Sequence, residues 1–417
     1  MSPHAIIWTI AAVATAGVII RPFDWPEAIW AATGAALLVI FGLLSPGDAL
    51  TGVRNGIDVY LFLTGMMLLA EIARHEGLFD WLAALATIWA KGSASRLFLL
   101  IYGVGTVVTT FLSNDATAVV LTPAVAAAVK TAKAQQPLPY LLICAFIANA
   151  ASFVLPISNP ANLVVYGSRM PALLDWLPRY LLPSVLAIVA TYVMLRWTQR
   201  AELRQPLAAV MPLPKLSGGG KAAALGIAGT AVVLLAASGL DLQLGLPTAV
   251  AGTLTAAAVL LCTRTKPWTI VKNISWGVLP LVAGLFVLVQ ALDNTGLIGV
   301  ISGPLRGDAA DSYGWTAWAA GVFVAFATNL MNNLPVGLIA GTAVQSANAS
   351  DPITSAILIG VDLGPNLSVT GSLATILWLT VLRREGQTIG TFRFLKLGFL
   401  VMPPALLLAL AGALLFR

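Results

Sequence analysis

The feature that most constrains this chain is a series of apolar blocks, each long enough to cross a bilayer and almost free of charge. A membrane-spanning helix needs about 20 apolar residues. Only 10% of the 417 residues are charged, whereas a soluble domain carries about 25% because its surface faces water. We therefore expect an all-α polytopic membrane protein with about ten transmembrane helices. The expected spans lie near residues 5–20, 27–45, 57–73, 138–166, 180–197, 222–239, 246–263, 275–292, 352–382 and 394–415.

Two further apolar stretches are too long for one helix and have polar centres. Residues 97–129 carry a single charge, Asp115, near the middle. Residues 312–350 carry no charge, and their centre reads TNLMNN. Non-helical backbone is tolerated at membrane depth only where protein or a water-filled cavity surrounds it. We therefore expect two re-entrant helical hairpins that enter and leave on the same side.

Three motifs recur in the same order in the two halves of the chain. GMMLLAEIARHEGLFD aligns with GLFVLVQALDNTGLIG, FLSNDATAVV with NLMNNLPVGL, and IANAASFVLPISNPAN with IGVDLGPNLSVTGSLAT. Each half holds five expected spans, and an odd number inverts the second half relative to the first. Inverted repeats with interrupted helices at matching positions are typical of secondary transporters. The predicted parts are a first inverted repeat, 1–198, with hairpin 96–130 and broken helix 138–166; a cytoplasmic linker, 199–221; and a second inverted repeat, 222–417, with hairpin 312–350 and broken helix 352–382.

The charges orient the chain and exclude several classes of protein. With the N-terminus outside, 18 of the 23 Lys and Arg lie in loops on the inner side, as the positive-inside rule requires. No basic stripe interleaved with exposed aromatics is present, so nucleic-acid binding is a poor interpretation. Cys144 and Cys262 lie in separate apolar segments without metal-ligand spacing, so we expect no metal site and no cofactor. The phosphate-binding sequence GxxxxGK[ST] is absent, which excludes ATP hydrolysis by that route.

Four polar clusters stand at membrane depth, at the two hairpin tips and in the two broken helices. Pro and Gly interrupt a helix and free its backbone groups, and Asn, Ser and Thr satisfy those groups or face a polar substrate. The alternative is that these small polar side chains only hold helices together. The candidate substrate-binding residues are Ser113, Asn114, Thr117, Asn149, Ser158, Asn159, Asn162, Asn332, Asn333, Asn366, Thr370 and Ser372.

Asp115 and Asp362 are the only carboxylates far from the ends of the expected spans. A carboxylate at that depth is costly, and it is usually either functional or paired. No Lys or Arg lies nearby in the sequence to neutralise either one. Because burial penalises the charged form, we expect proton uptake, and our hypothesis is that one or both carry a coupling proton. The alternative is a structural role as a helix-terminus cap. Glu71 and Arg74, three residues apart at a span end, are interpreted as a local ion pair at the water interface.

The sequence resembles a known family over nearly its whole length. FLSNDATAVVLTP, LPISNPANLVVYG, MNNLPVGLIAG and GVDLGPNLSVTGSLATILWLTVLRREG are similar to segments of the ArsB-type arsenite efflux pumps of the ion transporter superfamily. The resemblance implies export of arsenite and antimonite as neutral trihydroxides, in exchange for protons, across the bacterial inner membrane. It also implies a soluble arsenite-stimulated ATPase as a partner of some members. The family's tip and broken-helix residues correspond here to Asn114, Asp115, Ser158, Asn159, Asn332, Asn333, Asp362, Asn366, Thr370 and Ser372. In some relatives an acidic residue stands where this chain has Asn149.

Neutral donors and acceptors suit a hydroxylated, uncharged solute, whereas ionised Asp115 and Asp362 would repel an anion. The alternatives are a sodium/proton antiporter, in which Asp and Asn coordinate the ion, and a citrate or dicarboxylate carrier of the same superfamily. A channel or a non-transporting receptor is a further class, which the paired broken helices disfavour. No nucleophile–base pair is recognisable, so the chain is not expected to be an enzyme.

Overall fold

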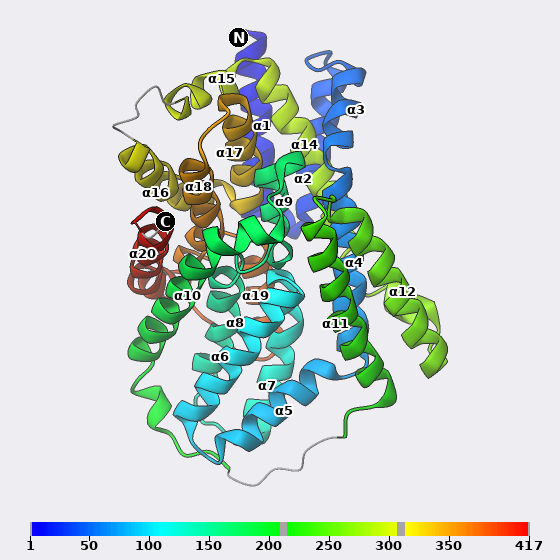
Figure 1. Ribbon diagram of the computed structural model, residues 1–417, viewed down its shortest axis with the longest axis vertical. Coiled ribbons are helices and arrows are strands. Elements are labelled where there is room, and N and C mark those ends of the chain that lie inside the picture. The colour runs from blue at the N-terminus through cyan, green and yellow to red at the C-terminus, as the bar shows by residue number, and fades with distance from the viewer. Residues whose placement is uncertain (1, 209–214, 307–312, 416–417) are drawn as a thin grey trace.

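The computed structural model describes residues 2–208, 215–306 and 313–415, and within these ranges the secondary structure is helical, without a strand. Figure 1 shows how the helices are arranged. In the first half they are α1 (Pro3–Ile20), α2 (Glu27–Ile40), α3 (Pro46–Asn55), α4 (Ile57–His75), α5 (Leu78–Ala90), α6 (Ala94–Phe111), α7 (Thr122–Thr131), α8 (Leu138–Ala150), α9 (Pro160–Tyr166) and α10 (Leu173–Thr198). In the second half they are α11 (Gly218–Gly239), α12 (Gly245–Thr263), α13 (Pro267–Val271), α14 (Val278–Asn294), α15 (Leu297–Ser302), α16 (Tyr313–Met331), α17 (Asn333–Ala347), α18 (Asp351–Leu363), α19 (Leu373–Arg384) and α20 (Thr391–Leu415).

The all-α membrane architecture expected from the sequence is confirmed. Among the described residues, six helices are long and apolar enough to cross a bilayer, namely α1, α6, α10, α11, α12 and α20. Two bent pairs raise the number to eight, with a 46° bend between α3 and α4 and a 79° bend after α14. Other expected spans are divided into shorter helices at their polar centres, as in α8 with α9 and α18 with α19.

Several boundaries differ from the expected ones. α2 ends at Ile40 rather than near residue 45, because the chain turns at Gly42, whose φ is +66°. α10 begins at Leu173 rather than near residue 180, although Pro178 and Pro183 lie inside it. α3, α5, α13 and α15 were not expected, since each has at most 13 residues and is too short to span a membrane.

Both predicted hairpins are present. α6 leads to a tip at residues 112–115, and a π-helical segment (Ala116–Leu121) then continues into α7. α16 reverses at Asn332 into α17, whose first turn the Asn332 side chain caps by accepting from the Leu334 amide at 3.4 Å. The first hairpin lies in the lower part of the molecule in Figure 1, and α17 of the second lies in the upper part.

Close helix crossings recur in the two halves. α4 packs on α12, where a Cβ built on Gly65 would lie 2.2 Å from the Thr248 carbonyl oxygen. α14 packs on α2, where a Cβ built on Gly284 would lie 2.6 Å from the Ala31 carbonyl carbon. Gly65 and Gly284 are the first residues of one of the recurring motifs. These matched contacts agree with a repeat, and the inversion of one half relative to the other stays a prediction.

The broken helices lie at the centre of the protein. Every residue of α8 is buried, and so is every residue of α18 from Ile353 to Leu363. The Trp378 indole of α19 donates to the Leu141 carbonyl of α8 at 2.9 Å, which joins the broken helix of one half to that of the other. The polar breaks are therefore held inside a packed core, as non-helical backbone at membrane depth requires.

Candidate functional site

The breaks in the two helices are built alike. The second part of each broken helix begins at a polar residue that caps it: the Asn159 side chain accepts from the Ala161 amide at 3.0 Å, and the Ser372 hydroxyl accepts from the Thr375 amide at 3.1 Å. Pro160 follows Asn159 at the first helical position, where its missing N–H costs nothing. Two of the predicted site residues, Asn159 and Ser372, thus set where α9 and α19 start.

Several hydrogen bonds join the broken helices across the halves, and two of them connect pairs of predicted site residues. Asn159 Nδ2 donates to Asp362 Oδ1 at 2.7 Å, and Asn149 Nδ2 donates to Asn366 Oδ1 at 3.0 Å. Asn366 Nδ2 in turn donates to the Phe146 carbonyl at 3.1 Å. Asp362 has no exposed surface, and its Oδ2 has no partner among the described residues. The structure therefore brings four predicted site residues into one sealed polar layer.

The first hairpin tip rests on the break of its own half. Ser158 Oγ donates to the Thr110 carbonyl at 3.0 Å, and the Thr109 and Thr117 hydroxyls lie 2.7 Å apart. Asn114 Oδ1 accepts from the Asp115 amide at 2.9 Å. Ser158, Thr117 and Asn114 are thus committed to holding the tip in this conformation.

The second tip is attached in the same way. The Asn333 amide donates to the Gly371 carbonyl at 2.9 Å, and Asn332 Nδ2 donates to the Thr370 carbonyl at 3.4 Å. The Thr370 hydroxyl donates to the Asn329 carbonyl at 3.0 Å. These residues contact the second break and make no hydrogen bond with the first tip in the described part of the chain.

One further predicted residue serves the break itself. Asn162 Nδ2 donates to the carbonyls of Ser152 and Leu155, at 2.9 and 3.3 Å, and so satisfies backbone acceptors that the interrupted helix leaves free. Its Oδ1 is buried without a partner among the described residues. In this state Asn162 supports the break.

Asp115 differs from all of these residues, because it faces a cavity. The cavity has a volume of about 490 Å³. Ser113 and Asp115 of the tip line it together with Pro160 at the start of α9, and the Asp115 carboxylate is partly exposed and makes no hydrogen bond with a described residue. Ser113 has φ +139°, a strained conformation for a residue with a Cβ. Such strain costs about 1–3 kcal/mol and clusters at functional positions.

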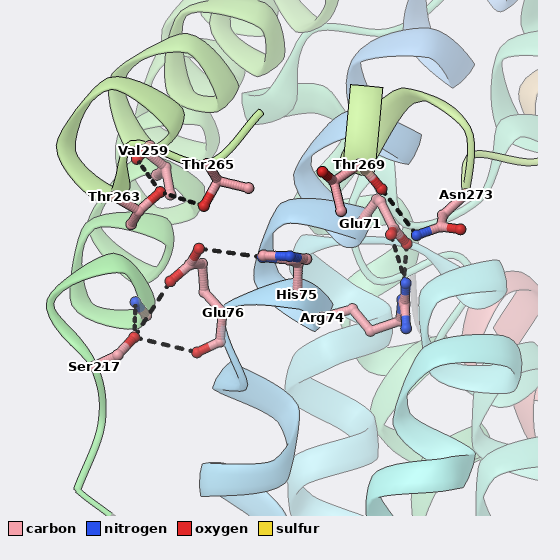
Figure 2. Close-up of polar contacts among 11 residues, drawn as sticks. Glu71, Arg74, His75, Glu76, Ser217, Val259, Thr263, Thr265, Thr269 and Asn273 are labelled. Carbon is pink, nitrogen blue, oxygen red and sulfur yellow. Dashed lines mark hydrogen bonds and ion pairs between the residues drawn. The ribbon is translucent and has the colours of Figure 1, made fainter. Parts of the chain in front are cut away.

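The outer part of this cavity is charged. Its lining includes Glu71 and Arg74 from the end of α4, with Arg384 and Glu385 from the end of α19. Figure 2 shows Glu71 and Arg74 pointing toward each other, with Arg74 Nε donating to Glu71 Oε2 at 2.8 Å. The ion pair expected from the sequence is confirmed, but Glu71 is only 7% exposed. Sequence reasoning missed that the pair lines the same cavity as Asp115.

The end of α4 is also joined to the second half. Glu76 accepts from the Ser217 hydroxyl, which caps α11, through its carbonyl and through its carboxylate, both at 3.4 Å. His75 Nδ1 lies 3.3 Å from Glu76 Oε1 (Figure 2). His75 therefore contacts this junction and does not line the cavity that holds Asp115.

A second cavity, of about 840 Å³, approaches the same helices from their other ends. It is lined by the beginning of α4, the ends of α9 and α14, and parts of α12 and α17. Asp58 lies in its wall, and its Oδ1 accepts from the Gly245 amide at 2.7 Å. The two cavities thus reach α4, α9 and α14 at opposite ends.

Interrupted helices, polar tips and cavities at both ends of the same helices define a multi-pass membrane transporter. The chain belongs to the citrate transporter family, CitMHS, whose sequence profile matches residues 7–361. It is 28% identical over 397 residues to the arsenical pump membrane protein of Escherichia coli, with 92% of each chain covered. It is 25% identical over 424 residues to the putative arsenical pump membrane protein of Bacillus subtilis, with 94% of each covered.

A solved structure shares the fold. The crystal structure of the YdaH transporter of Alcanivorax borkumensis matches with a TM-score of 0.55 at 14% identity, covering 100% of this chain and 97% of that one. The resemblance to the ArsB-type family and the all-helical transporter fold are both confirmed by these comparisons.

Proposed function

We propose that this protein exports arsenite and antimonite, as neutral trihydroxides, across the bacterial inner membrane by proton antiport with alternating access. The observation that carries the proposal is Asp115, an unbonded carboxylate on a strained hairpin tip that faces a cavity. The names of the relatives, which are arsenical pump membrane proteins, support the substrate. Neutral amides and hydroxyls around the breaks supply the donors and acceptors that a polyol-like solute needs.

The charge of the cavity disfavours a carboxylate carrier. Its lining holds two arginines and three carboxylates, Glu71, Asp115 and Glu385. Arg74 is already paired with Glu71. A carrier of citrate would need an excess of cationic donors to receive the substrate, whereas this surplus of carboxylates favours a neutral or cationic solute. The sodium/proton antiporter remains the second candidate and is decided by the experiment below.

The two carboxylates at membrane depth, Asp115 and Asp362, are proposed to have different roles. Asp115 can exchange a proton with the cavity and is assigned the coupling proton. Asp362 is buried and accepts a hydrogen bond from Asn159, so it positions the start of α9. Its carboxylate would reach water only if the broken helices separate. Proton binding at Asp115 and solute binding at Ser113, which lines the same cavity, would then compete at one tip. Asn114 would bind the solute once its side chain leaves the Asp115 amide. A ligand shifts a conformational equilibrium only through its differential affinity for the two states, and this competition would supply that difference.

The remaining polar residues are proposed to bind the solute in another conformation, because in this one their side chains are buried or half-buried at the tips and breaks. Movement of a hairpin tip from its break would free the groups that now bond each other. These residues are Thr117, Asn149, Ser158, Asn159, Asn162, Asn332, Asn333, Asn366, Thr370 and Ser372. Association with a soluble arsenite-stimulated ATPase is likewise a proposal, tested by co-purification of such a subunit from an arsenite-grown host.

The function is tested by uptake into everted membrane vesicles energised by a proton gradient. Arsenite uptake is expected in the wild type and should collapse with an uncoupler. Asp115→Asn should reduce uptake at least tenfold, Asp115→Glu should retain part of it, and Asp80→Asn, which removes an exposed carboxylate on α5, should leave it unchanged. Unimpaired uptake in Asp115→Asn would refute the coupling role. Proton efflux evoked by sodium, or uptake of citrate in place of arsenite, would replace the proposed substrate.

A further inference from the structure

A small pocket lies where the end of α10 meets the beginning of α20, at the end of the molecule from which the linker leaves α10. The two helices pack antiparallel, since Gly412 near the end of α20 lies against Pro183 near the beginning of α10. The pocket has a volume of about 380 Å³. None of its residues belongs to the transport site described above. In Figure 1 the end of α10 lies at the lower left.

Three cations surround this pocket. Arg200 comes from the turn after α10, and Arg393 and Lys396 come from the first turns of α20. The Arg200 guanidinium also lies over the Trp197 ring, 5.7 Å from its centroid. Glu202 is the one carboxylate in the lining, so the pocket keeps an excess of positive charge. Arginine and lysine together form a favourable site for a phosphate group.

The pocket also holds two acceptors that lack a donor. Gln199 is 3% exposed, and its Oε1 is buried without a partner among the described residues. Glu202 Oε2 is likewise buried without a hydrogen-bond partner among the described residues. Gln199 Nε2 is used within the chain, since it donates to the Thr198 hydroxyl at 3.3 Å. Buried polar atoms are nearly always hydrogen-bonded, so these two oxygens lack donors that the described part of the chain does not supply, and a headgroup that carries donors as well as a phosphate would supply them.

The surroundings place this ligand at the surface of a bilayer. Trp197 is 50% exposed, as an aromatic residue at the membrane–water interface would be. An exposed apolar stripe runs along α10 away from the pocket, with one residue on each turn. It consists of Leu181, Val185, Val189 and Val193, which are 51%, 47%, 53% and 52% exposed. Residues four apart lie on one face of a helix, so the stripe is continuous with the pocket and offers a surface for acyl chains.

We propose that this pocket binds the headgroup of a phosphatidylethanolamine molecule of the surrounding membrane. Its phosphate lies among Arg200, Arg393 and Lys396. Its ammonium donates to Gln199 Oε1 and to the Glu202 carboxylate, and its acyl chains lie along the exposed stripe of α10. Basic pockets between transmembrane helices are known to receive lipid headgroups, and the carboxylate beside the cations selects a zwitterionic one. The lipid would fasten the α10–α20 pair at one end without taking part in transport.

The test is native mass spectrometry of the purified full-length protein with added phospholipids that share the same acyl chains. Phosphatidylethanolamine should bind more tightly than phosphatidylglycerol, which has hydroxyl donors but no positive charge. Phosphatidylcholine should bind most weakly, because its quaternary ammonium cannot donate. Arg393→Gln and Lys396→Gln should each weaken binding of phosphatidylethanolamine about fivefold. The matched control Lys133→Gln removes an exposed cation elsewhere and should change nothing.

The acceptors are tested separately. Glu202→Gln should weaken binding of phosphatidylethanolamine and leave that of phosphatidylglycerol unchanged, because only the ammonium loses its counter-charge. Lys396→Arg keeps the positive charge and should retain binding. Weak binding in Lys396→Gln would then reflect the lost charge and not misfolding caused by a change at this position. Equal binding of phosphatidylethanolamine and phosphatidylcholine, or an equal loss in Lys133→Gln, would overturn the proposal. Displacement of the lipid by inorganic phosphate would also overturn it and would identify the pocket as a site for free phosphate.

Discussion

The crossing of α4 and α12 offers a sharp test of how this protein is packed. A Cβ on Gly65 would lie 2.2 Å from the Thr248 carbonyl oxygen and 2.8 Å from the Ala249 amide nitrogen. Gly252 makes the reciprocal approach, 2.5 Å from the Gly65 carbonyl oxygen. The obstacles are backbone atoms of a neighbouring helix, which cannot rotate away as a side chain can. Small residues at such crossings let transmembrane helices approach closely, so Gly65→Ala should force the two helices apart.

The cost follows from that distance. An ordinary carbon–oxygen contact is more than 1 Å longer than 2.2 Å, so α4 must move relative to α12 along much of its length. Overpacking of a well-packed core costs about 1–3 kcal/mol, and a rigid backbone obstacle places Gly65→Ala near the upper limit. A loss of about 3 kcal/mol lowers the ratio of folded to unfolded protein roughly a hundredfold. Gly229→Ala is the matched control, because a Cβ at Gly229 on α11 has nothing within 4 Å.

The measurement is the equilibrium unfolding of purified protein in mixed micelles as the fraction of denaturing detergent is raised, followed by tryptophan fluorescence. Gly65→Ala should unfold at a clearly lower detergent fraction than the wild type. Gly229→Ala should unfold at the same fraction or a higher one, since Ala has the greater helix propensity. Gly284→Ala, at the corresponding crossing of α14 with α2, should resemble Gly65→Ala. Equal midpoints for Gly65→Ala and Gly229→Ala would refute the reasoning.

Three other predictions concern the polar interior. Asn366→Leu removes the cross-link between the broken helices and should lower the free energy of unfolding by about 1–2 kcal/mol; an unchanged detergent midpoint would show that the link is not needed. Arg74→Gln leaves Glu71 without its counter-charge and should cost about 1–2 kcal/mol, discounted because Arg74 is 44% exposed; a double variant that also carries Glu71→Gln should recover part of the loss. A water-soluble carbodiimide with an amine should label Asp115 much faster than Asp362, as read by peptide mass spectrometry, since only Asp115 borders a cavity. Equal labelling would mean that Asp362 also reaches water.

Much of the fold was predictable because membrane insertion forces a simple pattern on the sequence. A bilayer excludes charge, so the charged residues bound the spans; residues 246–263 were predicted, and α12 is Gly245–Thr263. The breaks were predictable as well, since Pro and Asn are conspicuous inside an apolar block. Short helices such as α5 and α15 were not predicted. The spacing of apolar residues in a segment of 13 or 6 residues does not distinguish a separate short helix from part of a span.

The partners within the site could not be predicted in the same way. Asn159 and Asp362 are 203 positions apart, and no local pattern states that their side chains meet. Glu71 and Asp115 line one cavity for the same reason, although each was interpreted separately from its sequence neighbours. A repeat can show that two segments are alike. It does not show which atoms of one approach the other, because that depends on how the helices cross.

The two deep carboxylates show why this matters for the mechanism. Asp115 and Asp362 stand on different elements, and a symmetric role for both is the simplest interpretation of the sequence. The structure separates them, since one borders a cavity and the other is enclosed and bonded to Asn159. A group can exchange protons with water only in a state that exposes it, so in this conformation Asp115 alone meets that condition. If Asp362 also carries a proton during transport, a second conformation must break its bond to Asn159 and open the layer between the halves. The same movement would release Asn159 from Asp362 and make it available to a substrate.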